Sequence, residues 1–174
     1  MTQTKSFRYA EVENCRAVEL PYDGEELSMV ILLPNEGSFE TFESSLSESK
    51  VSQILANMNE INLSLSMPKF SFTSDFAMGE TLEEMGMSDA FDSMTANFNA
   101  MIEINDLFIE EVFHKAFVSV NEKGTEAAAA TAVMVARGGH EESLELNRPF
   151  IFFIRDIQTG AVVFLGRVMD PTKD

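Results

Sequence analysis

The feature that most constrains this chain is an alanine-rich run flanked by threonines, within residues 122–132. At the period of two that a strand has, small side chains fall on one face: Thr125, Ala127, Ala129 and Thr131. A strand with such side chains can slide between other strands without opening a packed core far. Gly124 lies just before the run, where its free φ permits a hinge. Because alanine also has the highest helix propensity, an alanine-rich helix, cut short by the threonines, fits the same residues.

The rest of the chain predicts an α+β fold, mostly antiparallel β. Apolar residues alternate or run on over six expected strand segments: 7–22 with a break near Glu13, 27–33, 61–74 with a break at Pro68, 107–120, 149–155 and 161–168. We expect 27–33 to be a central buried strand. The segment 107–120 is long enough for the centre of a large sheet.

Between these expected strands, the spacing of apolar residues predicts short helices, and turn-forming residues predict turns. Two short helices are expected within 39–58, the second capped by Ser47 or Ser49. A further short helix is expected over 81–85, ended by Gly86. Turns are expected at 22–25, which contains Asp-Gly, and at 158–160.

Composition excludes some classes of partner. The 174 residues are 45% apolar, which indicates a globular chain, either one domain or part of a larger one. Net charge is −17, from 29 acidic and 12 basic residues. Because phosphate binding depends on clustered lysine and arginine, we expect neither nucleic acid nor an anionic membrane as a partner. The acidic excess is interpreted as a solubility feature.

The sequence carries no sign of a disulfide, a membrane helix, a metal site or an enzyme motif. Cys15 is the single cysteine and is expected to be a structural thiol. No run reaches the roughly 18 apolar residues of a membrane helix, and residues 1–20 lack a signal-peptide core. His140 has no partners at metal-ligand spacing, so we expect neither metal nor cofactor. The sequon at Asn62 lies in an expected buried strand, which predicts that it is silent.

Three motifs occur in an order and at a spacing that resemble the serpin family of serine protease inhibitors. They are 112–121 (VFHKAFVSVN) leading into 122–128, 144–154 (LELNRPFIFFI) and 164–171 (FLGRVMDP). Weaker similarity runs back through Pro68 to Met1. Serpins are roughly twice this long, so residues 1–174 resemble the C-terminal part of a single serpin domain. The resemblance implies a multi-sheet fold with a reactive-centre loop at about 122–143.

The resemblance also implies a mechanism, namely suicide inhibition rather than enzymatic activity. A target serine protease would cut the loop, remain attached as an acyl-enzyme, and be trapped when the loop inserts into a sheet. The residues that match the family's hinge are Glu122, Gly124, Thr125, Glu126, Ala127, Ala128, Ala129, Ala130 and Thr131. Lys69, Glu122 and His114 match residues that control opening of the sheet.

The bond to be cut has two candidates. Arg137 is the charged anchor in this stretch and precedes a glycine, which predicts a trypsin-like protease cutting between Arg137 and Gly138. The usual family spacing instead places the bond between Gly138 and Gly139. An elastase- or subtilisin-like protease would cut after Val135 or Ala136.

Alternatives to inhibition follow from the same resemblance. One is a non-inhibitory serpin-like carrier, chaperone or storage protein, and another is a β-rich interaction fragment. A further expected partner is the missing N-terminal half of the fold. An extracellular location rests on the family resemblance alone.

Overall fold

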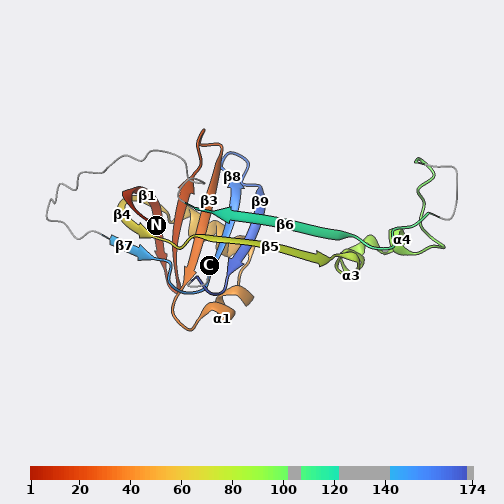
Figure 1. Cartoon of the computed structure of the whole chain (residues 1–174), viewed down its shortest axis with the longest axis horizontal. Helices are drawn as coiled ribbons and strands as arrows, with labels where there is room; N and C mark the ends of the chain where they lie inside the picture. Colours follow the sequence, from red (N-terminus) through yellow and green to blue (C-terminus); the bar gives the residue numbers. More distant parts are fainter. Residues whose placement is uncertain (102–106, 122–141, 172–174) are drawn as a thin grey trace. The chain divides into compact units, whose positions relative to one another are not determined.

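The computed structural model describes residues 1–101, 107–121 and 142–171 (Figure 1). The chain divides into two compact units, which are described separately. The larger unit comprises Met1–Phe70 and Val120–Asp174, and the smaller one comprises Ser71–Ser119. No helix in the described ranges is long and apolar enough to cross a membrane.

The larger unit is built on a seven-stranded sheet in the order β7-β4-β1-β2-β3-β8-β9. Its strands are β1 (Thr2–Val12), β2 (Cys15–Pro21), β3 (Leu27–Pro34), β4 (Asn59–Ser66), β7 (Glu142–Glu145), β8 (Phe150–Asp156) and β9 (Val162–Val168). Neighbouring strands are antiparallel except β4 and β7, which are parallel. The α+β class and five of the six predicted strand segments are confirmed over most of their length, with 61–74 split at Pro68 as expected.

Strand β3 forms the buried centre of this sheet, as predicted. It lies between β2 and β8, and every residue from Ser28 to Pro34 is buried. Its side chains alternate between the two faces of the sheet, so a run of apolar residues here supplies both faces with core. The predicted turn before it is also confirmed, since Gly24 has φ 87° and the Tyr22 N–H donates to Leu27 O over 2.9 Å.

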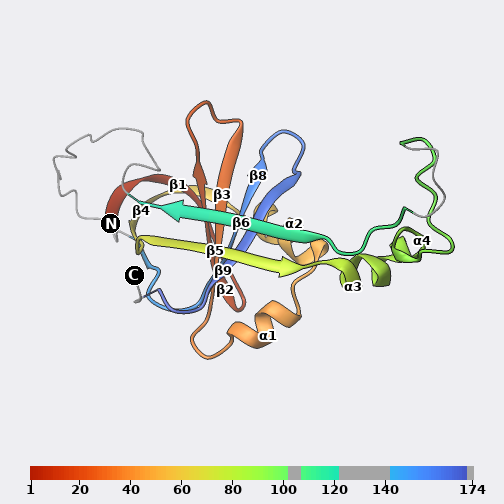
Figure 2. The same cartoon turned by 45° about the vertical axis from the view of Figure 1, so that its right-hand side comes forward.

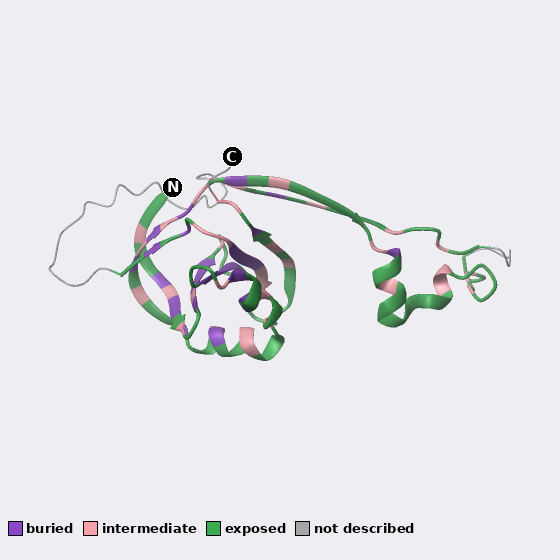
Figure 3. Cartoon of the chain, turned by 90° about the horizontal axis from the view of Figure 1, so that it is seen from below, coloured by how far each residue is buried: buried purple, intermediate pink, exposed green. Residues whose placement is uncertain are grey.

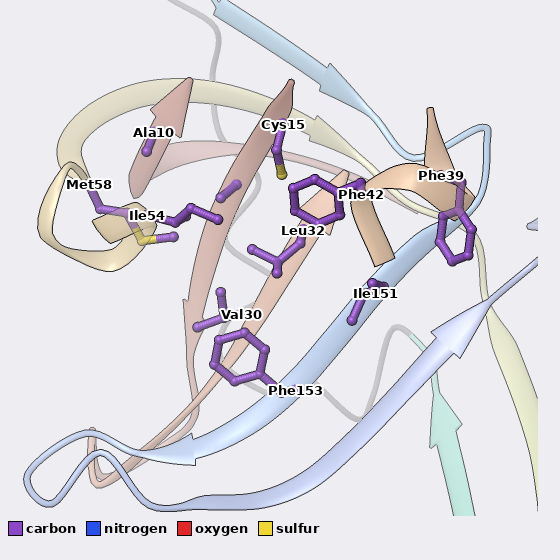
Figure 4. Packing of buried hydrophobic residues seen from close by; sticks show 11 residues of the cluster. Ala10, Cys15, Val30, Leu32, Phe39, Phe42, Ile54, Met58, Ile151 and Phe153 are labelled. Carbon is purple, nitrogen blue, oxygen red and sulfur yellow. The ribbon is translucent and has the colours of Figure 1, made fainter. Parts of the chain in front are cut away.

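Helices α1 (Phe39–Ser44) and α2 (Glu48–Ala56) pack on one face of the sheet (Figure 4). Both helices were predicted, and Ser47 is the cap of the second, because its Oγ accepts from the Lys50 N–H over 3.3 Å. Their buried side chains join residues of four strands in one cluster. The cluster consists of Ala10, Cys15, Ala17, Val30, Leu32, Phe39, Phe42, Ile54, Met58, Ile151 and Phe153.

The opposite face of the sheet is rich in aromatic rings. Phe150 and Phe152 are fully buried, and the Phe70 ring lies with its centroid 5.9 Å and 5.4 Å from theirs. The ring of Phe164 stacks on Phe152 at 5.8 Å. Gly166 in β9 faces the same ring, so closely that a Cβ there would lie 2.7 Å from Phe152 Cζ. A side chain at position 166 would therefore force the packed Phe152 ring to move.

The smaller unit contains a two-stranded sheet of β5 (Phe70–Ala77) and β6 (Phe113–Val120), which run side by side in Figure 2. Between them lie α3 (Gly79–Leu82), the π-helical turn η1 (Glu83–Met87) and α4 (Ser88–Phe91). Most residues from Ser71 to Phe91 are exposed (Figure 3). Gly86, predicted to end a helix, lies inside η1, where its φ of 102° interrupts the helical backbone.

One expectation for this region is wrong, because the strand predicted over 107–120 begins at Phe113. Among the described residues this strand pairs with β5 in a two-stranded sheet, and a place at the centre of a larger sheet stays a prediction. Polar contacts explain the shorter strand. The Glu111 carboxylate accepts from the Gly79 and Val112 N–H groups at 2.9 Å each. Val112 O accepts from the Met78 N–H at 2.8 Å, so this segment holds the start of α3 rather than a strand ladder.

Candidate functional site

The predicted reactive loop lies almost entirely outside the described residues. This applies to the hinge at 122–131 and to both candidate bonds, Arg137–Gly138 and Gly138–Gly139. The structure does describe the strands that lead into and out of this segment. Strand β6 ends at Val120 and β7 begins at Glu142, so the last two residues of the predicted loop belong to a strand.

Strand β7 fixes the C-terminal end of the segment on the larger unit. It runs parallel to β4, with Leu63 opposite Glu142 and Leu65 opposite Leu144. Leu144 and Leu146 are buried, and the Leu146 N–H donates to Ser66 O over 2.8 Å. Buried leucines at alternate positions therefore hold this end of the segment to the sheet edge.

Strand β6 leads into the segment from its N-terminal side. Within the described part of the chain it has one neighbouring strand, β5. Its side chains at Phe113 and Phe117 are 79% and 65% exposed. A strand with one paired edge and large exposed apolar side chains is a template for the addition of another strand.

The described sheet-control residues are both at the surface. Lys69 is exposed in the connection between β4 and β5, and its predicted partner Glu122 is outside the described residues. His114 is exposed on β6, with its ring centroid 5.3 Å from that of Phe76 on β5. His114 therefore shares a face of the two-stranded sheet with Phe76.

A buried ionic cluster around Glu19 escaped sequence reasoning. Glu19 is 3% exposed, and its carboxylate accepts hydrogen bonds from side chains on three other strands. Ser28 Oγ donates over 2.6 Å, and Arg155 donates to Oε1 from Nε over 3.0 Å and from Nη2 over 2.6 Å. Arg8 Nη1 donates to Oε2, while its Nη2 donates to Leu55 O at the end of α2 over 3.2 Å.

The surroundings of Glu19 keep its carboxyl ionised. Burial alone would raise its pKa, but hydrogen bonds from Ser28 and Arg155 and the charges of Arg155 and Arg8 outweigh burial, so the pKa lies below its ordinary value. Because its oxygens are engaged by these donors, the cluster is suited to joining β1, β2, β3 and β8 rather than to catalysis. The available signal in the sequence was a lone acidic residue within the apolar row of Ala17, Val18 and Leu20.

The structure also tests the expectations for Cys15 and for the sequon at Asn62. Cys15 is buried, and burial raises the pKa of its thiol to about 12, so it is a neutral structural thiol as predicted. Asn62 of the sequon is exposed on β4, so the expectation that it is buried is wrong; alternation places it on the face opposite Leu63. In the described ranges, no group of three potential metal ligands is brought together.

Comparisons with known proteins agree on one family. The family model described as serpin (serine protease inhibitor) matches residues 1–171. An uncharacterized serpin-like protein of Thermococcus kodakarensis is 43% identical over 176 residues, covering 98% of this chain and 41% of that protein. Human leukocyte elastase inhibitor is 40% identical over 182 residues, covering 98% and 48%.

A solved structure gives the same result. Thyroxine-binding globulin in complex with thyroxine superposes with a TM-score of 0.84 at 28% identity, covering 99% of this chain and 46% of the other. The chain spans less than half the length of the relatives it matches. Sequence and fold together therefore show that this chain belongs to the serpin family, of whose full-length members it matches a part.

Proposed function

We propose that this chain is the loop-bearing part of a serine protease inhibitor. The target protease cuts the loop within 122–143, and insertion of the cut loop into a sheet then inactivates the protease. Family membership and the inhibitory name of the human relative support this proposal. The small residues of the hinge support it as well, since they would enter a sheet with little steric resistance. In this role the chain is a substrate that traps its enzyme and is not itself an enzyme.

The chemistry belongs to the target protease. Its serine attacks the carbonyl carbon of Arg137, the bond to the Gly138 nitrogen breaks, and an ester joins Arg137 to the serine. In the alternative register the ester forms on Gly138 and the leaving nitrogen is that of Gly139. The new amino terminus takes up a proton and stays attached to the chain through β7. A trypsin-like target follows from the positive charge of Arg137.

The observation that carries the proposal is the single paired edge of β6 in the described structure. The hinge at 122–131 continues directly from β6, so it can fold back beside that edge as a new strand. About ten new ladder hydrogen bonds at about 0.5–1.5 kcal/mol each give on the order of 10 kcal/mol. This gain is comparable with the whole stability of an ordinary domain, about 5–15 kcal/mol, and is enough to drive insertion.

Control of insertion is assigned to Lys69, Glu122 and His114. An exposed ion pair between Lys69 and Glu122 would contribute at most about 1 kcal/mol to stability. Its proposed role is kinetic, because it would hold the start of the loop until cleavage. His114 is proposed to act from the face of the two-stranded sheet that it shares with Phe76 of β5.

Because the chain spans less than half of its relatives, we propose that inhibition requires the remaining portion of the fold as a partner. A two-stranded sheet is marginally stable by itself, and the seven-stranded sheet exposes Val163 and Leu165 on its edge strand β9. A partner chain that supplies further strands and helices would cover both surfaces.

The test uses trypsin with two forms of the protein. One is the chain alone, and the other is a chimera in which the chain replaces the matching segment of the Thermococcus kodakarensis protein. We expect the chimera to form a complex with trypsin that survives denaturing electrophoresis. Thr125→Arg should convert it into a substrate that is cut without a stable complex. Glu126→Arg should leave it an inhibitor, because alternation at a period of two assigns Glu126 to the opposite face from Thr125. A Thr125→Arg chimera that inhibits at unchanged stoichiometry contradicts the insertion mechanism.

A non-inhibitory carrier is the second candidate, favoured by the structural match to thyroxine-binding globulin. The two candidates differ in thermal melting before and after cleavage of the loop in the chimera. Insertion should raise the melting temperature sharply, whereas a carrier without insertion should melt unchanged. A β-rich interaction fragment predicts neither a trypsin complex nor a melting shift.

A further inference from the structure

A pocket of about 460 Å³ opens in the larger unit between the β1–β2 turn and helices α1 and α2. Its inner wall is formed by Val12, Cys15, Phe42 and Ile54. The last three of these are also buried members of the helix-side cluster, and they lie together in Figure 4. Sites for small molecules have volumes of about 300–1,000 Å³, apolar walls and a few placed polar groups. The pocket has a volume in this range, and four of the nine residues that line it are apolar.

The polar groups lie at the rim. Among the described residues that line the pocket, Lys50 is the one basic residue and Glu13 the one acidic residue. The Lys50 ammonium is held in place, because it donates to Ser45 Oγ over 2.6 Å and lies 4.3 Å from the centroid of the Phe42 ring. An ammonium has three N–H donors, so the bond to Ser45 leaves it able to donate to a ligand. A positioned positive charge therefore stands directly beside the apolar wall.

We infer that this pocket binds a small carboxylate, with its apolar body against Cys15 and Ile54 and its carboxylate accepting from Lys50. The amides of Asn14 and Gln53 line the same rim and offer further donors. The Cys15 thiol is kept neutral by burial, so the wall carries no charge that would repel the ligand. Glu13 is exposed at the turn, and water screens its repulsion of an anion. The inference goes beyond protease inhibition and involves no residue of the loop.

The experiment places a reporter in the pocket. The chain contains no tryptophan, so Asn57→Trp at the rim gives a tryptophan emission that comes from the pocket alone. The probes are 4-phenylbutanoate and its uncharged counterpart 4-phenylbutanamide. We expect saturable quenching by the acid and at least tenfold weaker binding of the amide, because one charge-assisted hydrogen bond is lost. Both titrations are repeated by calorimetry on the unmodified chain. Binding there without quenching in the tryptophan variant would show that the tryptophan blocks the pocket.

Substitutions of charged residues then locate the interaction. Lys50→Met keeps the aliphatic stem and should weaken binding of the acid about tenfold, while Glu13→Gln should strengthen it about twofold. Lys5→Met is the matched control, since Lys5 Nζ also lies over a phenylalanine, 5.0 Å from the Phe7 ring centroid, but outside the pocket. It should leave the affinity unchanged. Equal binding of acid and amide, an equal effect of the two lysine substitutions, or no saturable heat or quenching up to 10 mM overturns the inference.

Discussion

Replacing Glu19 by alanine is the most direct test of what holds the seven-stranded sheet together. The substitution leaves Arg155 without its carboxylate, and the Arg155 side chain is only 12% exposed. Removing one partner of a buried ion pair costs about 3–5 kcal/mol, because the remaining charge stays away from water. Arg8 adds at most about 1 kcal/mol, since its side chain is 41% exposed and therefore screened.

We therefore expect Glu19→Ala to lower the free energy of unfolding by about 3–5 kcal/mol, against the about 5–15 kcal/mol of an ordinary domain. Urea unfolding followed by far-ultraviolet circular dichroism measures the loss. Glu43→Ala is the matched control, because Glu43 also pairs with an arginine of another element, Arg167, but at the surface. Its expected cost is at most about 1 kcal/mol. Equal losses of unfolding free energy in the two variants would refute the reasoning. If the Glu19→Ala variant does not fold, Glu19→Gln takes its place in the same measurement.

Three further predictions concern pH, packing and the thiol. The folded-state pKa of Glu19 lies below its ordinary value of 4.5, so its carboxylate stabilises the fold above that pH, and the stability advantage over Glu19→Gln should shrink as pH falls below 4.5. Equal pH profiles of the two proteins in urea titrations would contradict this. Gly166→Ala should cost about 1–3 kcal/mol by the same assay, because the added Cβ lies 2.7 Å from Phe152 Cζ, whereas Val163→Ala on the exposed face should cost little. Cys15 should react with a thiol reagent at pH 8 only as the chain unfolds, since burial raises its pKa to about 12; complete labelling within minutes in native buffer would disprove this.

Local patterns were sufficient for most of the strands and for the first two helices. Alternation marks β1 and β4 because each has neighbours that bury at least part of one face. Continuous apolar runs mark β3 and β8 because consecutive residues of these strands are buried. Ser47 was identifiable as a cap because its type and position satisfy the first turn of α2.

What the sequence did not reveal depends on partners distant along the chain. Strand β7 has four residues, too few for a periodic signal, and it is held beside β4 by its buried Leu144 and by Leu146, which follows the strand. The alternation of 107–120 suggested a longer strand, but the Glu111 side chain engages two backbone N–H groups before β6 begins. The Glu19 cluster depends on the register of neighbouring strands, which no local pattern fixes. For the loop residues the sequence predictions stand as predictions.

The position of β7, β8 and β9 has a consequence for the products of cleavage. Any cut between Val120 and Glu142 would divide the polypeptide into two pieces, and the shorter piece would carry all three of these strands. Because β8 is hydrogen-bonded to β3 and β7 to β4, the strands of the shorter piece remain paired with strands of the longer piece in one sheet. A nicked molecule should therefore travel as one particle in native chromatography and separate into two bands only in detergent.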